Sequence, residues 1–349
     1  MEKEKNEMRR FSTNLRGDFL KPAKRRAIAG LVFWSCLLIG PEILAAAERI
    51  IIGSPGPSIS ILPIELAVRK GFFKQEELEV LNVTMRTNIV INALLTGEID
   101  YATSIGSVLR GATRGLPVRS VGILLGRPDY FLTVKPGINS LKELKGKRIA
   151  IGNYGSSSDV ALRAILEEEG VDPEKEVQRF QMGGTSSRFA ALMAGSVDAT
   201  ILSIPYNFLA EKKGFRNLLW IGGRVEMPLA GIGVRLQKID TQSAEIVKTL
   251  RAVARAISFA KSNPDATVEV LMNWTKIDRE AAVASYDLGR KSWPDYLITS
   301  DKPLQAVVEQ VAREMQTSKI PPLDRVRDWS FARQVKRALD GGAQEGERR

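Results

Sequence analysis

ALLTGEID at residues 93–100 and ALMAGSVD at residues 191–198 are two similar stretches that indicate the fold of this chain. Each stretch has the pattern of a helix end, a stopping glycine, an apolar residue and an aspartate that opens a strand. A predicted strand and a predicted helix precede both stretches in the same order. The repetition indicates two lobes of similar architecture within one chain.

Outward from these stretches, apolar segments alternate with helix-like segments through both halves of the chain. Apolar runs of four to eight residues bounded by glycine or polar turns are typical of strands in a parallel sheet, and helices between them complete βαβ units. The predicted strands span residues 49–53, 78–85, 99–103, 118–125, 148–151, 177–182 and 197–202. Two predicted helices span residues 61–70 and 159–169. A third runs from Asn88 to Gly97, and a fourth ends at Gly195. The expected fold class is therefore α/β.

The last third of the chain is predicted to return to the first lobe. Residues 228–234 read as a strand, and residues 243–261 form a long amphipathic helix pattern that Pro264 ends. Further helices are expected at residues 281–288 and 304–315. The polar tail from Gly341 is expected to be disordered.

The N-terminus has the order of a secretory signal peptide. A basic cluster at residues 21–26 precedes an apolar stretch at residues 27–40, and Ala45-Ala46-Ala47 offers a cleavage site before Glu48. The apolar run is short for a membrane span. Cleavage near Ala47 is expected, and an N-terminal anchor is the alternative. The polar residues 1–20 leave open whether Met8 is the start.

Composition excludes several classes of function. The 349 residues contain no histidine and one cysteine, Cys36, which lies in the leader. Ser-His-Asp and Cys-His catalysis, zinc sites with His or Cys ligands, and disulfides in the mature chain are excluded. The net charge of +11 is dispersed after residue 48, without a basic stripe with interleaved aromatics, so nucleic-acid binding is not expected.

Residues 69–80 and 141–150 resemble a known family. RKGFF at residues 69–73 followed by ELEV at residues 77–80 is similar to a signature of the SsuA/THI5-like (NMT1-type) periplasmic binding proteins, and so are the two stretches quoted first. LKELKGKRIA at residues 141–150 resembles the family's opening of the second lobe. The family serves ABC importers for nitrate, sulfonates, taurine and thiamine precursors.

The resemblance implies a two-lobed periplasmic-binding-protein fold of type II, with a two-strand hinge near residues 131–134 and 230–234. Lobe one would comprise residues 48–132 and 231–320, and lobe two residues 133–230. Residues 1–47 would be the N-terminal extension and signal peptide, and residues 321–349 a C-terminal helix and disordered tail. The implied partners are a small-molecule ligand and an ABC permease, for a periplasmic monomer with no cofactor and no metal.

The ligand site is expected in the loops beyond the carboxyl ends of the strands, because ligands of open α/β sheets bind there. These loops are rich in Gly, Ser, Thr and Asn, whose free N–H groups and hydroxyls suit a polar or anionic ligand. Aromatic residues nearby are candidates for stacking, and Arg127 and Arg188 for counter-charge. The candidate ligand-binding residues are Ser54, Pro55, Ser58, Asn88, Thr103, Ser104, Tyr154, Ser156, Ser157, Thr185, Ser203, Tyr206 and Trp293.

Simpler structural roles compete with these assignments. Ser156 and Thr185 are also suited to capping helices, Ser54-Pro55-Gly56 to a plain turn, and the aromatics to the core. Two other functions remain open: a ligand sensor for a membrane signalling protein, and an enzyme related to thiamine-pyrimidine synthesis. The latter chemistry, as known in the resembled superfamily, uses histidine and a cysteine-rich motif that this chain lacks.

Overall fold

The computed structural model describes residues 47–346, with the side chains of Thr87, Asn88 and residues 342–346 left out. The described residues form one compact unit. The expected signal peptide lies outside the described residues. No helix within residues 47–346 has the length and apolar character needed to cross a membrane.

The first of two sheets has five strands in the order β2-β1-β3-β10-β4. Strand β1 lies between β2 and β3 and is parallel to both, whereas β10 runs antiparallel to β3 and β4. The strands are β1 (Glu48–Ser54), β2 (Leu78–Thr84), β3 (Tyr101–Ala102), β4 (Val118–Leu125) and β10 (Ala230–Arg235). Because β10 comes from the far end of the chain, it closes this sheet only after the second sheet is complete.

The second sheet repeats the same arrangement in the order β7-β6-β8-β5-β9. Strand β6 is parallel to β7 and β8, and β5 runs antiparallel to β8 and β9. The strands are β5 (Tyr130–Val134), β6 (Arg148–Ile151), β7 (Gln178–Gln181), β8 (Ala199–Ser203) and β9 (Arg216–Trp220). In each sheet the one antiparallel strand is the first strand after the chain arrives from the other sheet.

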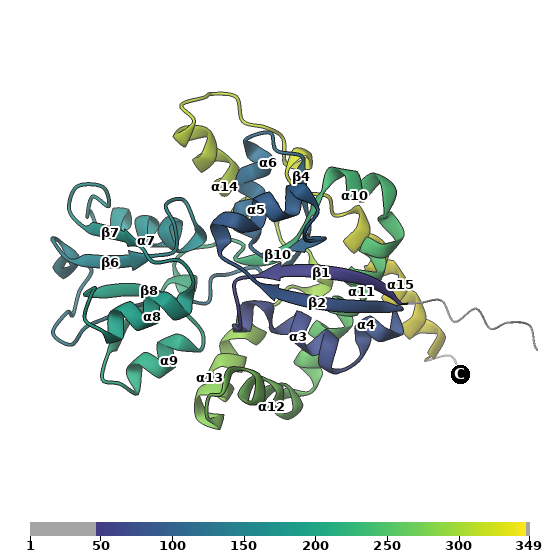
Figure 1. The fold of residues 1–349 in the computed structure, drawn as a ribbon, viewed down its shortest axis with the longest axis horizontal. Helices are drawn as coiled ribbons and strands as arrows, with labels where there is room; N and C mark the ends of the chain where they lie inside the picture. The colour runs from purple at the N-terminus through teal and green to yellow at the C-terminus, as the bar shows by residue number, and fades with distance from the viewer. Residues whose placement is uncertain (1–46, 347–349) are drawn as a thin grey trace, which may run out of the picture. The chain divides into compact units, whose positions relative to one another are not determined.

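Helices cover both faces of each sheet, so the chain forms two lobes (Figure 1). In the first lobe, α5, α6 and α14 share one hydrophobic cluster with the sheet, while α3, α11, α12 and α13 belong to another. The first-lobe helices are α3 (Leu62–Arg69), α4 (Phe72–Gln75), α5 (Thr87–Thr96), α6 (Ile105–Thr113), α10 (Leu236–Thr241), α11 (Ser243–Ser262), α12 (Pro264–Thr275), α13 (Arg279–Arg290), α14 (Asp301–Glu314) and α15 (Ser330–Gly346). The second-lobe helices are α7 (Ser157–Glu168), α8 (Thr185–Met193) and α9 (Tyr206–Glu211).

The two crossings between the sheets lie earlier than expected. The sequence predicts the hinge at residues 131–134 and 230–234. In the structure these residues belong to β5 and β10 and are paired within the two sheets. The connecting segments are residues 126–129 and 221–229, because β4 ends at Leu125 and β9 at Trp220. The expected boundary after residue 132 falls inside β5, and the assignment of lobes by residue range stays a prediction.

The aspartates of the two repeated stretches play the same part in both lobes. Asp100 accepts a hydrogen bond from the backbone N–H of Ile51 in β1 at 2.8 Å, and Asp198 accepts one from Arg148 in β6 at 3.0 Å. Each aspartate also pairs with a lysine that follows the antiparallel strand: Lys238 after β10 and Lys135 after β5. The repetition therefore reflects a shared carboxylate that ties three strands together.

Several local expectations were wrong. Asn88 lies inside α5, and the N-cap position belongs to Arg86. Residues 341–346 of the expected disordered tail continue α15, and residues 347–349 lie outside the described residues. The long helix α11 ends before Pro264 as expected, and Pro264 also begins α12, because proline is favourable in the first helical turn where no N–H is needed. Helices α4, α6, α9, α10 and α12 and strand β9 are additional to the predicted elements.

Candidate functional site

A cavity of about 150 Å³ lies where loops of both lobes meet. It is lined by residues that follow β1, β3, β6 and β8, at the carboxyl ends of these parallel strands. Because the cavity lies beyond the strand ends, its wall is formed by loop residues and by residues at the starts of α6, α7 and α8. The site is therefore where the sheet topology places a ligand in α/β proteins.

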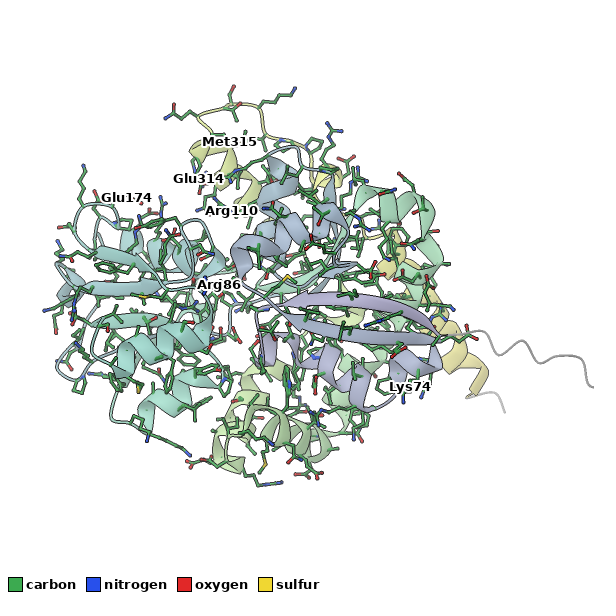
Figure 2. All side chains as sticks on the ribbon, in the orientation of Figure 1. Lys74, Arg86, Arg110, Glu174, Glu314 and Met315 are labelled. Carbon is green, nitrogen blue, oxygen red and sulfur yellow. The ribbon has the colours of Figure 1, made fainter. Side chains whose placement is uncertain are left out.

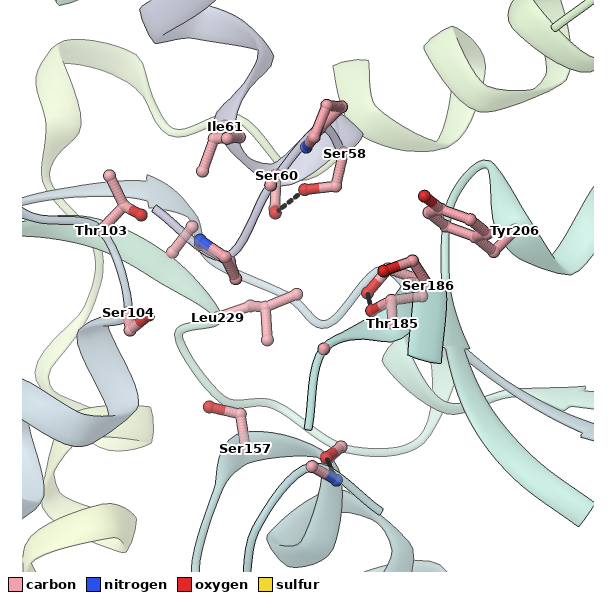
Figure 3. A pocket seen from close by; sticks show the side chains of 18 of the residues that line it. Ser58, Ser60, Ile61, Thr103, Ser104, Ser157, Thr185, Ser186, Tyr206 and Leu229 are labelled. Atoms are coloured by element: carbon pink, nitrogen blue, oxygen red, sulfur yellow. Dashed lines mark hydrogen bonds between the residues drawn. The ribbon is translucent and has the colours of Figure 1, made fainter. Parts of the chain in front are cut away.

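The wall from the first lobe consists mainly of small polar residues. Ser58 and Ser60 share a hydrogen bond of 2.6 Å between their hydroxyls; Ser58 precedes the short helical turn before α3, and Ser60 lies within it. Thr103 donates to the carbonyl of Gly53 at 3.2 Å, and Ser104 stands at the N-cap of α6. Figure 3 shows these hydroxyls on one side of the pocket, with Ile61 and Leu229 as apolar neighbours.

The wall from the second lobe carries the pocket's one charged residue. Arg188 in the first turn of α8 is 4% exposed and lines the cavity. Its Nε donates to the carbonyl of Ile201 at 2.8 Å, and its Nη2 donates to Thr185 Oγ1 at 3.0 Å. Thr185 and Ser203 hydroxyls lie 3.3 Å apart, and Tyr206 stands beside them (Figure 3). A fixed cation thus sits among neutral hydroxyls.

Residues 58–267, well over half of the chain, match the family described as NMT1/THI5 like. The chain belongs to the NMT1/THI5-like family. The matched segment includes residues of both sheets and most of the pocket wall.

Relatives of this NMT1/THI5-like chain include both binding proteins and enzymes. The riboflavin-binding protein RibY of Chloroflexus aurantiacus is 27% identical over 62% of this chain and 64% of its own length. The 4-amino-5-hydroxymethyl-2-methylpyrimidine phosphate synthase of Schizosaccharomyces pombe is 34% identical over 32% of this chain and 33% of its own length. The chain thus matches less than two thirds of the length of either relative.

Solved structures confirm the fold. The periplasmic aliphatic sulphonate binding protein SsuA from Escherichia coli superposes with a TM-score of 0.64 at 19% identity, covering 80% of this chain and 97% of that one. The expected two-lobed α/β architecture of the periplasmic binding proteins is therefore confirmed.

Most of the candidate residues named from the sequence line this one pocket. The structure brings together Pro55, Ser58, Thr103, Ser104, Ser156, Ser157, Thr185, Ser203 and Tyr206. They come from five segments at strand ends that are far apart in the sequence. As contacts of a ligand they stay a prediction.

Four candidates are not among the lining residues. Ser54 is buried and donates to Asn82 within the first sheet. Tyr154 is 57% exposed and donates to the carbonyl of Arg179, away from the cavity. Trp293 is buried in the core, edge-on to Tyr286. The side chain of Asn88 lies outside the described residues.

The pocket also contains residues that the sequence analysis did not select. Tyr130 and Leu229 adjoin the two crossings, and Thr84 ends β2. The sequence predicts the crossings a few residues later than the structure has them, so it gives no reason to select Tyr130 and Leu229. Arg188 was considered only as a counter-charge, because arginine is usually exposed and its burial depends on tertiary packing. Arg127, the other candidate, is half-exposed, pairs with Glu226 and does not line this pocket.

Several hydroxyls of the pocket have no side-chain hydrogen bond within the described part of the chain. Ser104 at the start of α6 and Ser157 at the start of α7 line the cavity without a side-chain hydrogen bond to the protein. They stand at the first turns of two helices, where backbone N–H groups are also unpaired. A polar ligand therefore meets donors from both lobes at these two positions.

The lobes touch beside these serines at two glycines. A Cβ on Gly106 of α6 would lie 2.5 Å from Ser157 Oγ, and one on Gly155 would lie 2.8 Å from Arg110 Nη2. Arg110 is held by Glu314 (Figure 2). Glu314 also pairs with Arg114. The absence of a side chain at both glycines lets the lobes approach over the pocket.

Proposed function

We propose that the protein is an extracytoplasmic solute-binding protein that encloses a small polar or anionic organic molecule between its lobes and delivers it to an ABC importer. The observation that carries the proposal is the hydroxyl-lined cavity, built from helix N-termini of both lobes around a buried arginine. A ligand that contacts both walls stabilises the closed arrangement over an open one by its differential affinity.

The relatives support a binding role, and their names suggest which classes of ligand to test. They include binding proteins for riboflavin and for aliphatic sulphonates. The periplasmic location named for SsuA agrees with the signal-peptide pattern of residues 21–47. A cavity of about 150 Å³ favours a small ligand or the head of a larger one.

An enzyme is the second candidate, because the pyrimidine phosphate synthases match part of the chain. No histidine is present in the sequence, and Cys36 precedes the expected cleavage site. The neutral hydroxyls of the pocket offer no general base at neutral pH. Binding without chemistry is the function that these residues serve best.

A thermal-shift screen of the purified protein against sulfonates, carboxylates, pyrimidines and oxyanions tests the proposal. A ligand present at 100 times its dissociation constant adds about 2.7 kcal/mol of stability, which raises the melting temperature by several degrees. The ligand should be recovered unchanged after prolonged incubation. A flat response across the whole panel, or conversion of the ligand, would contradict a receptor role.

The double variant Ser104→Ala/Ser157→Ala is expected to bind the ligand found in the screen about tenfold or more weakly, because two neutral hydrogen bonds contribute about 0.5–1.5 kcal/mol each. Isothermal titration calorimetry measures the loss. Ser196→Ala is the matched control, since Ser196 is an exposed serine of the second lobe that does not line the pocket. Equal ligand affinities of the double variant and the control would show that these two hydroxyls do not bind the ligand.

Gly106→Val is expected to weaken ligand binding at least tenfold while the protein still folds. The added side chain meets Ser157 at the contact between lobes, so the closed state loses stability and the separate lobes do not. Calorimetry gives the affinity, and small-angle scattering with saturating ligand should show incomplete compaction. Ser107→Val, one residue along α6 and outside this pocket, controls for a β-branched residue in the helix. Wild-type affinity in Gly106→Val would show that the lobes do not close at this point.

A further inference from the structure

Asp129 is a buried carboxyl group at the edge of the candidate site. It is the last residue of the first crossing, directly before β5, and it is 3% exposed. Neither of its carboxylate oxygens has a hydrogen bond of good geometry among the described residues, although its own backbone N–H and the Ser203 hydroxyl lie near enough to lower its pKa. Buried carboxylates are normally paired or hydrogen-bonded, since an isolated charge is costly to remove from water.

The groups around Asp129 belong to the pocket wall. They are Tyr130 on β5, Ser203 on β8 and Arg188 on α8, and all three line the cavity. Arg188 is the one cation among them. On the crossing itself, Arg127 is half-exposed and paired with Glu226. The charge balance of this end of the pocket therefore depends on Asp129 and Arg188.

Arg188 is held without an ion pair inside the described part of the chain. Its three hydrogen bonds go to the carbonyl oxygens of Ile201 and Gly183 and to the hydroxyl of Thr185. A guanidinium group has five N–H donors, so two remain after these bonds. The neutral acceptors fix the side chain in place and leave its positive charge uncompensated by direct contact.

Burial raises the pKa of Asp129 to about 8, even though the nearby Arg188 and Ser203 act to lower it. The same burial lowers the pKa of Arg188 and raises that of Tyr130. Below about pH 8 the carboxyl group of Asp129 thus holds a proton, and the field of Arg188 faces the cavity without a competing anion.

We propose that Arg188 receives a negatively charged oxygen of the ligand and that Asp129 is protonated whenever this anion is bound, so that anion and proton are taken up together. An ionised Asp129 would repel the ligand anion and compete for the charge of Arg188. A neutral ligand has no such competition and binds without proton uptake. The proposal rests on the solute-binding function and names the ligand class of the same site.

The test uses ethanesulfonate as the anionic probe, because a sulfonate stays ionised from pH 6 to pH 9, and thymine as a neutral probe. Calorimetric titrations at both pH values are expected to give an affinity for ethanesulfonate about tenfold weaker at pH 9 than at pH 6. At pH 9 about one proton is taken up for each anion bound, measured from the dependence of the heat on buffer ionisation, and at pH 6 almost none.

Three variants separate a charge effect from a structural one. Asp129→Asn is expected to bind ethanesulfonate with the same affinity at pH 6 and pH 9 and without proton uptake. Arg188→Gln is expected to lose ethanesulfonate binding at both pH values while keeping a cooperative thermal transition. Arg188→Lys, which retains the charge, should recover part of the binding.

The outcomes distinguish this inference from the function on which it rests. Equal affinities of the wild type at pH 6 and pH 9 would overturn it, and so would a pH dependence that persists in Asp129→Asn. Binding of thymine, or of any neutral member of the screening panel, without binding of ethanesulfonate would overturn anion capture and leave the receptor function standing. Failure of every ligand class in the panel would overturn both.

Discussion

Lys238→Met is expected to lower the free energy of unfolding by about 3–5 kcal/mol, because it leaves a buried carboxylate without its cation. Lys238 is 1% exposed and bonds to Glu245, to Gln242 at 2.9 Å and to Asp100 at 3.2 Å. Glu245 is itself 4% exposed and also accepts from Tyr101. Methionine keeps the aliphatic volume, so chemical denaturation of this variant reports mainly the lost charge.

The second lobe contains the matched control for this prediction. Lys135 occupies the equivalent place after β5 and pairs with Asp198, but its side chain is 32% exposed. Water solvates the aspartate when this lysine is removed, and Arg148 still pairs with it. Lys135→Met is expected to cost less than about 1 kcal/mol. Equal effects of the two substitutions would show that burial does not decide the strength of these pairs.

A further control removes both buried charges together. In the double variant Lys238→Met/Glu245→Gln, no buried charge of this pair is left without its partner. Removing both partners of a buried pair is often close to neutral, whereas removing one is strongly destabilising. The double variant is therefore expected to be more stable than Lys238→Met alone. If it is less stable than Lys238→Met, Glu245 contributes through contacts other than the ion pair.

Asp129→Asn is expected to stabilise the protein by up to about 4 kcal/mol at pH 7, where one pKa unit corresponds to about 1.4 kcal/mol. Burial raises the pKa of Asp129 to about 8 in the folded state, against an ordinary value near 4 in the unfolded chain. The cost of keeping the carboxyl group buried therefore begins above about pH 4 and is complete above about pH 8. Denaturation curves at pH 5, 7 and 8.5 should show the gain over wild type increasing with pH.

Asp198→Asn is the control of opposite sign for the Asp129 prediction. Hydrogen bonds from Arg148 are the main cause that lowers the pKa of Asp198, and Lys135 adds to them against the effect of desolvation. A lowered folded pKa contributes stability above about pH 4 that is lost as the pH falls through the folded value. This variant should be less stable than wild type by about 1–3 kcal/mol at pH 7, with the difference shrinking in acid. A stability of Asp129→Asn that equals wild type at all three pH values would contradict the burial argument.

The sequence determined the α/β class and the duplication because both depend on local patterns. The apolar runs of β1, β4 and β6 and the helix-stopping glycines Gly97 and Gly195 are readable over a few residues. The resemblance to the family supplied the two lobes and the hinge. The topology rule for ligand sites then directed attention to the loops in which nine of the candidate residues proved to line one pocket.

Only the tertiary structure decided which polar groups are buried, paired or left free. Arg188 and Asp129 look like ordinary surface residues in the sequence, and their burial follows from the way α8, β8 and the first crossing pack together. Tyr154 and Trp293 resemble stacking residues until packing places one on the surface and the other in the core. Burial is a property of contacts between distant segments, so the local sequence determines the element in which a charge lies but not the dielectric environment that sets its energy.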